Sequence, residues 1–420
     1  MLSERQQNLL SWVRQHAVPL KAVEAGCGFS DLQPLKPVIG SARIVALGEA
    51  THGTREFFRL KHRLLEFLVT EMEFTSFAME ANWPECVAVN DYVLHGRGDP
   101  AAILGGLHCW PWDTEEVLDL ILWMRQYNMA STHKKITFSG FDAQFTALAA
   151  TTIQGYLAQV DPEFAATIAP RMMPFEKECR SYSDVSEADE LLSTARDLAE
   201  RLRTEERTYV ARSTTEEWRL ACQHVRTLCQ VMEQRRAGDE EKTRYMIRDK
   251  AMAENVGWIL ENEGPQGKMV VWAHNGHVAR DPHGIFGGAI VSMGMHLARR
   301  FDPDLLVIGF AFGEGAFQAV VKEEGNRRPI RAVTVGPAPD ETLDAVLART
   351  GIPVFMVDLR HADKDVAQYL QEPQITREIG AFFTDPEDMC KKVVPKARYD
   401  VLAFIANTTG ARRNPRLAPS

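Results

Sequence analysis

The chain has 420 residues, of which 45% are hydrophobic and 25% are charged, and its formal net charge at pH 7 is −9. This length exceeds what one compact core accommodates, so we expect two lobes or one enlarged domain. The composition is that of a globular protein and excludes a wholly disordered or fibrous chain. The negative charge disfavours nucleic acids and anionic membranes as partners, because both bind basic surfaces.

The sequence predicts a cytoplasmic protein with no membrane partner. Its first residues include Glu4 and Arg5 and only a short apolar stretch, which is typical of neither a signal peptide nor an anchor. No run of 18 apolar residues occurs, so no transmembrane helix is expected. The seven cysteines are odd in number and form no C-x-x-C motif, which suits free thiols in a reducing compartment.

Short apolar runs that are rich in β-branched residues or flanked by glycine predict buried strands. Helical patterns separate the early runs, at Thr54–Met72, Glu85–Leu94 and Thr114–Asn128. This alternation predicts an α/β fold with a mostly parallel central sheet covered by helices. The predicted strands are Arg43–Gly48, Thr75–Met79, Ile136–Phe141, Met269–Ala273, Leu305–Phe312, Pro353–Val357 and Tyr399–Ile405.

The middle of the chain has a different pattern. No strand signal appears from about residue 149 to residue 262, and helical spacing dominates at Glu187–Thr204 and Trp218–Arg236. Prolines at 162, 170 and 174 are expected to break the start of this region. We interpret the region as a helical insertion that forms one wall of a cleft. The predicted organisation is 1–148 as the first part of the α/β domain, 149–262 as the helical lobe and 263–420 as the second part of the α/β domain.

Ionisable side chains occur at the carboxyl ends of the first four predicted strands. The carboxyl ends of parallel strands face one edge of a sheet, where ligands bind, so these side chains are expected to converge there. In chain order they are Glu49, His52, Glu80, Asp142, His274 and His277. For Asp142 taken alone, a helix cap is an equally good interpretation.

The first of these groups has the residue types needed to activate water. A histidine accepts a proton from water near neutral pH, and a carboxylate beside it fixes the tautomer and stabilises the imidazolium that forms. Glu49 and His52 lie three residues apart around a turn that contains Gly53. Thr54 is the predicted N-cap of the next helix, whose positive end would stabilise nearby negative charge.

Lys61 falls on the apolar face of the predicted helix 54–72, where a charged residue is unexpected. One interpretation is a side chain that covers apolar surface and extends its ammonium group to water. The other is a cation that reaches the cleft, where it keeps Glu49 or Glu80 ionised or binds an oxyanion.

Common catalytic and nucleotide-binding motifs are absent. The sequence has no G-x-S-x-G elbow, which disfavours a serine hydrolase of the α/β-hydrolase type. It also has no P-loop and no G-x-G-x-x-G motif, and we predict no cofactor. His52, His274, His277 and the glutamates are candidate zinc ligands, but they do not form a compact H-E-x-x-H motif. Metal-independent chemistry is therefore the leading prediction, with a zinc-dependent hydrolase as an alternative.

Four segments of the chain resemble the erythromycin esterase family, and the similarity covers nearly the whole length. They are VALGEATHGTREFF at Val45–Phe58, FAMEANW around Glu80, ITFSGFDAQ around Asp142 and VVWAHNGHVA around His274. The resemblance implies a sheet domain, a helical lobe and a deep cleft, together with hydrolysis of the lactone ester of 14-membered macrolides.

The resemblance also implies roles for individual residues. It places the water-activating histidine at His52, its supporting carboxylates at Glu49 and Glu80, and a second essential histidine at His274. A family arginine falls on Lys61, which keeps the positive charge but lacks the planar bidentate fork.

Bulky side chains near these segments are candidates for contact with a large apolar substrate. For each of them, ordinary packing remains an alternative, and for Arg248 the alternative is a surface ion pair with Asp249 or Glu254. The predicted substrate-binding residues are Trp83, Trp110, Trp112, Tyr245, Arg248, Met293 and His277.

Together these features predict a carboxylic ester hydrolase that acts on a small-molecule substrate, either a bulky ester or a macrolactone. His52 is the predicted general base and Glu49 orients it, while Glu80, Lys61 and His274 position water, the carbonyl group or the oxyanion. A non-catalytic protein that binds an apolar ligand is an alternative of a different class.

Overall fold

The computed structural model describes residues 2–132, 134–176, 185–282, 290–323, 327–385 and 389–415. The chain forms two compact units. We call the first the sheet unit, and it comprises Met1–Glu80, Ala88–Ser139 and Val256–Ser420. The second is the helical unit, which comprises Ala81–Val87 and Gly140–Asn255. The predicted lobe, 149–262, overlaps most of the helical unit but begins and ends later than it does.

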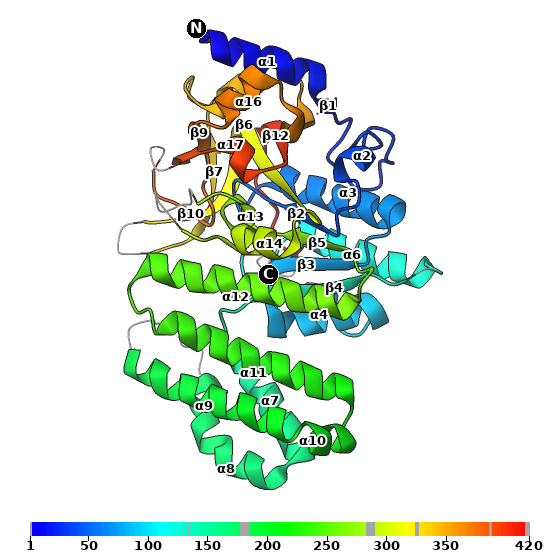
Figure 1. The fold of residues 1–420 in the computed structure, drawn as a ribbon, viewed down its shortest axis with the longest axis vertical. Helices are drawn as coiled ribbons and strands as arrows, with labels where there is room; N and C mark the ends of the chain where they lie inside the picture. Colours follow the sequence, from blue (N-terminus) through cyan, green and yellow to red (C-terminus); the bar gives the residue numbers. More distant parts are fainter. Residues whose placement is uncertain are drawn as a thin grey trace. The chain divides into compact units, whose positions relative to one another are not determined.

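A mostly parallel sheet of ten strands confirms the predicted α/β fold (Figure 1). Its order is β1-β8-β12-β6-β2-β5-β3-β4, and β7 and β10 also pair with β6. The central pairs β6–β2, β2–β5 and β5–β3 are all parallel. The strands are β1 Val18–Pro19, β2 Ile44–Leu47, β3 Ser76–Asn82, β4 Thr137–Asp142, β5 Met269–Trp272, β6 Leu305–Val321, β7 Ile330–Val335, β8 Val354–Asp358, β10 Phe382–Phe383 and β12 Val401–Thr408.

All seven predicted strands are present, because each carries the run of buried apolar residues from which it was predicted. β6 extends nine residues beyond its predicted end at Phe312. The sequence missed β1, β7 and β10, together with the separate two-stranded sheet of β9, Gln374–Arg377, and β11, Cys390–Val393. β7 is largely exposed, and β1 and β10 have only two residues each, so they lack a long apolar run.

Helix α3, Arg55–Met72, follows β2 and buries twelve of its residues. Thr54 is its N-cap residue, as predicted, and the Thr54 hydroxyl lies 2.6 Å from the Thr51 hydroxyl. Among the described residues, none of the helices combines the length and the apolar character needed to cross a bilayer.

The sheet unit contains further helices besides α3. They are α1 Glu4–His16, α2 Leu35–Ile39, α4 Trp83–His95, α5 Pro100–Gly105, α6 Glu115–Ala130, α13 Asn275–Val278, α14 Met293–Phe301, α15 Leu343–Ala348, η3 Leu359–His361, α16 Lys364–Leu370 and α17 Pro395–Arg398, of which α4 begins in the helical unit.

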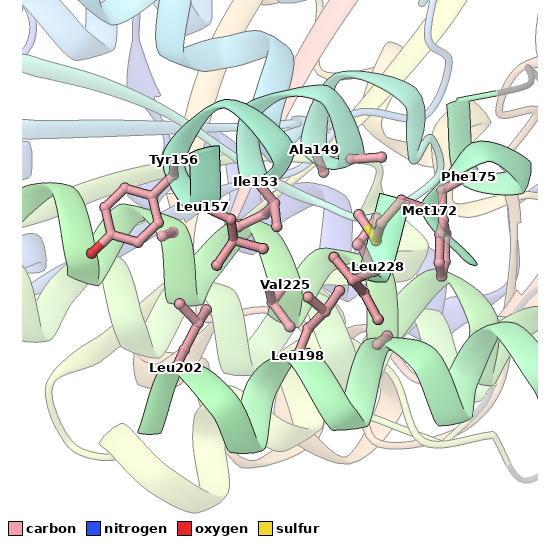
Figure 2. Close-up of a cluster of buried hydrophobic side chains, with 14 of the residues drawn as sticks. Ala149, Ile153, Tyr156, Leu157, Met172, Phe175, Leu198, Leu202, Val225 and Leu228 are labelled. Atoms are coloured by element: carbon pink, nitrogen blue, oxygen red, sulfur yellow. The ribbon is translucent and has the colours of Figure 1, made fainter. Parts of the chain in front are cut away.

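The helical unit packs around its own apolar core, and α9 and α11 lie side by side in it (Figures 1 and 2). Figure 2 shows Ile153, Leu157, Leu198, Val225 and Leu228 directed toward one another in this core. Burying each such side chain contributes about 1.5–3 kcal/mol to folding. Its elements are α7 Ala147–Val160, α8 Pro162–Met172, η1 Met173–Glu176, α9 Val185–Thr204, α10 Glu206–Arg212, α11 Thr215–Arg235 and α12 Glu241–Glu263, the last of which ends in the sheet unit.

Two of the three prolines in this region lie at helix boundaries, as predicted, and Pro170 does not. Pro162 begins α8, where its fixed φ suits the first turn and its missing N–H costs nothing. Pro170 lies inside the same helix, near its end. Pro174 lies in η1, directly after α8.

Candidate functional site

Strand register brings three of the predicted ionisable groups to one level of the sheet. Leu47 of β2 and Met79 of β3 both align with Trp272, the last residue of β5. Glu49, Glu80 and His274 lie one or two residues beyond these aligned positions, so three parallel strands deliver them to the same edge. β3 continues to Asn82, so Glu80 lies within the strand rather than after it as predicted.

Glu49 is completely buried and accepts hydrogen bonds from three side chains. Its Oε1 lies 2.7 Å from His52 Nδ1. Its Oε2 accepts from Lys61 Nζ at 2.6 Å and from Trp272 Nε1 at 2.9 Å. One carboxylate oxygen thus receives both an ammonium ion and an indole N–H, and hydrogen bonds between charged groups are the strong ones.

These contacts determine the tautomer of His52. Ionised Glu49 is only an acceptor, so the proton between Oε1 and Nδ1 belongs to His52 Nδ1. In the neutral ring, Nε2 then carries the lone pair. His52 is therefore oriented to accept a proton at Nε2 while Nδ1 stays on Glu49, which is the arrangement that a general base requires.

Lys61 is fully buried, so it does not extend to water as the first interpretation required. Its Nζ donates to Glu49 Oε2 at 2.6 Å and lies 3.4 Å from the carbonyl oxygen of Ala273. Burial lowers the Lys61 pKa to about 8, against the opposing attraction of Glu49 and Glu80. At neutral pH Lys61 remains the cation that balances Glu49.

Glu80 has different partners, which come from the segment after β5. Its Oε2 accepts the backbone N–H of His274 at 3.0 Å, and its Oε1 lies 3.2 Å from His277 Nε2. His277 is buried in α13 and faces Glu80. Glu80 thus holds the backbone of one histidine and the ring of another.

His274 is fixed in the opposite tautomer from His52. Its Nδ1 accepts the backbone N–H of Gly276 at 3.1 Å, and a backbone N–H can only donate. The proton of the neutral ring is therefore on Nε2, which lies 3.4 Å from the carbonyl oxygen of Ala50. Burial, with a further contribution from His52 and His277, lowers the His274 pKa well below its ordinary value, so the ring stays neutral. The His52 and His274 ring centroids are 5.1 Å apart.

Two glycines allow the backbone to approach closely around this site. A Cβ on Gly48 would lie 2.2 Å from Asn275 Oδ1, and the Asn275 side chain is held by both backbone groups of Phe310 in β6. A Cβ on Gly53 would lie 2.0 Å from the carbonyl oxygen of Gln318. Any larger residue at either position would displace the segment that carries Glu49 and His52.

A loop far along the chain completes the frame, and sequence reasoning missed it. The Ile379 N–H donates to the Ala50 carbonyl at 2.8 Å, and the His52 N–H donates to the Gly380 carbonyl at 3.3 Å. Gly380 has φ of 71°, a left-handed conformation that favours glycine. Nearby, buried Glu378 accepts a hydrogen bond from buried Arg398 at 2.6 Å.

Besides His277, three predicted substrate-binding residues lie in the sheet unit. Trp112 is buried, its indole N–H donates to the Glu80 carbonyl at 2.7 Å, and its ring lies 5.6 Å from the His52 ring. Trp110 is half-buried in the loop before α6, and Met293 is buried at the start of α14. Of these three, Trp112 is the one with described contacts to the histidine site.

The remaining predicted residues belong to the helical unit. Trp83 is buried with its ring 4.8 Å from that of His224, and Tyr245 is half-buried in α12. Arg248 binds Asp142 through two hydrogen bonds of 2.9 and 2.7 Å.

Asp142 is not the cap of the following helix. The N-cap position of α7 is Thr146, four residues later. Asp142 instead accepts from Arg248 and from the backbone N–H of Ala143.

The described residues contain no group of three or more His, Cys, Asp or Glu side chains arranged to hold a metal ion. His52 and His274 Nδ1 already have the hydrogen-bond partners described above, and His277 Nε2 faces Glu80. The zinc ligands proposed from the sequence thus do not converge on a shared position among these residues.

Comparison with known proteins places these observations in a family. The family model for erythromycin esterase matches residues 69–408. Erythromycin esterase type II of Escherichia coli is 26% identical over 334 residues, which cover 74% of this chain and 79% of that protein. A crystal structure of a Bacillus cereus protein superposes with a TM-score of 0.85 at 26% identity, covering 97% of this chain and 99% of the other. A mutant of the erythromycin esterase EreC in its open conformation shares the fold, with a TM-score of 0.73 at 17% identity over 91% of this chain and 95% of that one.

Proposed function

Since the chain belongs to the erythromycin esterase family, a family of esterase-like hydrolases, we propose that it opens the lactone ester of a macrolide or a similarly bulky ester, using water activated by His52. The observation that carries the proposal is the chain of contacts from Lys61 through Glu49 to His52 Nδ1, which leaves His52 Nε2 as the proton acceptor.

In the proposed reaction, water attacks the ester carbonyl carbon while His52 Nε2 takes one of its protons. Ionised Glu49 stabilises the imidazolium that forms, because Nδ1 still donates to Oε1 at 2.7 Å. When the tetrahedral intermediate collapses, the bond from carbon to the alkoxide oxygen breaks and His52 returns its proton to the alkoxide. The products are a carboxylic acid and an alcohol, joined in one ring-opened chain when the substrate is a lactone.

His274 is proposed to act as a hydrogen-bond donor toward the carbonyl oxygen. Its Nδ1 lone pair is occupied by the Gly276 N–H, so the neutral ring has no lone pair left for a water proton. Its Nε2–H is held near His52 by the segment after β5. A pre-oriented donor of this kind stabilises the negative charge that develops on oxygen.

Glu80 and Lys61 are proposed to position these two histidines. Glu80 holds the backbone of His274 and the ring of His277, and Lys61 keeps Glu49 ionised. The macrolactone substrate is supported by the name of the Escherichia coli relative.

The proposal is tested by incubating the purified chain with 14-membered macrolides and with short p-nitrophenyl esters, with and without a chelator. Mass spectrometry then detects the addition of one water molecule to each substrate. We expect macrolide hydrolysis ahead of the short esters, with activity retained in the chelator. Hydrolysis of short esters alone would contradict the macrolide as substrate but would still support ester hydrolysis as the reaction. Loss of activity in the chelator with recovery on adding zinc would favour the metallohydrolase, and binding without product would favour the non-catalytic alternative.

A further inference from the structure

We propose that Trp272 is a positioning residue for ester hydrolysis, whose indole N–H sets the direction of the Glu49 carboxylate and through it that of His52. The inference rests on the proposed role of His52 as general base. Trp272 is the last residue of β5 and is completely buried, two positions before His274. Its Nε1–H donates to Glu49 Oε2 at 2.9 Å.

Trp272 and Lys61 approach the same carboxylate oxygen from different elements, β5 and α3. An ammonium group is a rotatable point charge with three protons, so Lys61 balances the charge of Glu49 but restrains its rotation weakly. The indole has one N–H in the plane of a rigid ring, so its hydrogen bond has a single direction. With Oε2 held by two donors, Oε1 is left facing His52 Nδ1.

The Trp272 ring is itself held in place by packing. Its centroid lies 5.2 Å from that of Phe58 and 6.1 Å from those of Phe77 and Trp112, and each pair meets edge to face. These arrangements are favourable for aromatic rings, and they leave the indole little freedom to turn. The direction of the N–H is therefore determined by the core of the sheet unit.

The same ring also supports the charge of Lys61. Lys61 Nζ lies 4.5 Å from the Trp272 ring centroid, within the range at which an aromatic face attracts a cation. Trp272 thus contacts both members of the ion pair, the cation with its face and the carboxylate with its N–H. Replacing the N–H alone separates these two contributions, because the ring face remains for Lys61.

Removing the indole N–H lets Glu49 rotate, so a smaller fraction of molecules has His52 correctly oriented. We expect kcat to fall roughly 10- to 100-fold, the loss typical for a hydrogen bond to a charged group. KM should change by less than about 2-fold, because Trp272 is completely buried and exposes no surface to the substrate. The acidic limb of the kcat/KM profile should move to lower pH, since a misaligned Glu49 stabilises the imidazolium less.

The experiment replaces Trp272 with benzothienylalanine, which keeps the bicyclic shape but has sulfur in place of N–H, and compares it with Trp272→Phe. Trp218→Phe is the matched control, because it also removes an indole hydrogen bond, to the Leu202 carbonyl at 3.0 Å in the helical unit. Each protein is assayed for kcat, KM, pH profile and thermal unfolding. The low-field proton resonance of His52 Nδ1–H, assigned by its loss in His52→Gln, gives a readout that needs no substrate.

We expect the benzothienylalanine variant to unfold at nearly the wild-type temperature, with reduced kcat, a displaced acidic limb and a weakened His52 resonance, while Trp218→Phe keeps wild-type values of all three. Unchanged kcat and an unchanged resonance in the benzothienylalanine variant would overturn the inference. A lower unfolding temperature with an unshifted profile would also overturn it, because that result describes a structural residue. If His52→Gln retains activity in the same assay, the proposed function fails; if only the Trp272 variants are unaffected, this inference fails alone.

Discussion

Two buried glutamates serve the histidines of this site in different ways. Glu49 binds a histidine ring through Nδ1 and is itself balanced by Lys61. Glu80 binds the backbone of His274 and the Nε2 atom of His277. The first arrangement leaves the far ring nitrogen, Nε2, as an acceptor, whereas the second holds a segment of backbone in place. A glutamate close to a histidine therefore does not by itself identify a base. What identifies a base is a second ring nitrogen that carries a free lone pair.

The same rule separates the two histidines whose rings lie 5.1 Å apart. His52 has its lone pair on Nε2, whereas His274 has its proton on Nε2, which lies 3.4 Å from the Ala50 carbonyl oxygen. In the proposed reaction, these opposite tautomers supply one group for the water proton and one for the carbonyl oxygen.

The largest effect is expected for His52→Gln. Glutamine keeps a polar side chain at the turn but cannot accept and return a proton, so kcat should fall about 10²–10⁴-fold, the usual contribution of a general base. Steady-state kinetics on the best ester substrate measures this change. His62→Gln is the control, because His62 is also buried and lies in α3, with its ring against Trp123. A kcat of His52→Gln close to that of the wild-type protein would show that His52 is not the general base.

A smaller loss, roughly 10- to 100-fold in kcat, is expected for Glu80→Gln. The amide retains an oxygen for one donor but loses the negative charge that holds the His274 N–H and the His277 ring, and hydrogen bonds to charged groups are worth about 1.5–3 kcal/mol. The acidic limb of the pH profile should persist, because His52 and Glu49 are unchanged. If Glu80→Gln lowered kcat as much as His52→Gln and also removed the acidic limb of the pH profile, Glu80 and Glu49 would have the same role.

The pH dependence at the alkaline end tests Lys61. With its pKa lowered to about 8 by burial, Lys61 should lose its proton above that pH, and Glu49 then loses its counter-ion. We expect kcat/KM to fall about tenfold between pH 8 and 9.5 in wild-type protein. In Lys61→Met the rate should be low throughout and this alkaline limb should be missing. An unchanged alkaline limb in Lys61→Met would assign the titration to another group.

As the pH rises above 8, the contribution of Lys61 to stability should increase, whereas its contribution to the catalytic rate should decrease. Its folded-state pKa of about 8 is below the ordinary value of 10.5, so between these values the unfolded chain binds more protons than the folded chain. The Lys61 contribution to the free energy of unfolding therefore rises as pH increases from 8 to 10.5. Chemical denaturation of wild-type and Lys61→Met proteins across this range measures the difference.

The smallest effect is expected for His277→Gln, which should lower kcat less than about tenfold. The contact from His277 to Glu80 is longer, at 3.2 Å, and the His274 N–H still holds the other oxygen of Glu80. The assay is the same steady-state measurement, with unfolding temperature as a check on the fold. A loss comparable to that of His52→Gln would give His277 a direct part in the reaction.

The sheet and most of its site residues could be predicted from the sequence because their signals are local. Each of the seven strands has a run of apolar residues, and ionisable residues interrupt or follow four of those runs. The order of parallel strands then brings Glu49, Glu80 and His274 together. The strands that were missed are short, such as β1 and β10, or largely exposed, such as β7.

The parts of the site that could not be predicted depend on contacts between distant segments. Trp272 ends an apolar strand and has the sequence context of a core residue; only its position against Glu49, 223 residues earlier, shows the hydrogen bond. The loop of Ile379 and Gly380 has no motif, and its relation to Ala50 and His52 arises from the fold. The glycine at position 380, which adopts a left-handed conformation, is the local sequence feature that could have indicated a turn there.

The assignment of base and donor is tested most directly by the acidic limb of kcat/KM, measured for wild-type, His52→Gln and His274→Gln proteins on one ester. A histidine that accepts the water proton must be neutral, so the wild-type rate should fall as the pH drops and the base becomes protonated. We predict that this limb persists in His274→Gln, at a lower overall rate, and disappears in His52→Gln. A limb that persists in His52→Gln and disappears in His274→Gln would contradict the assignment and make His274 the base.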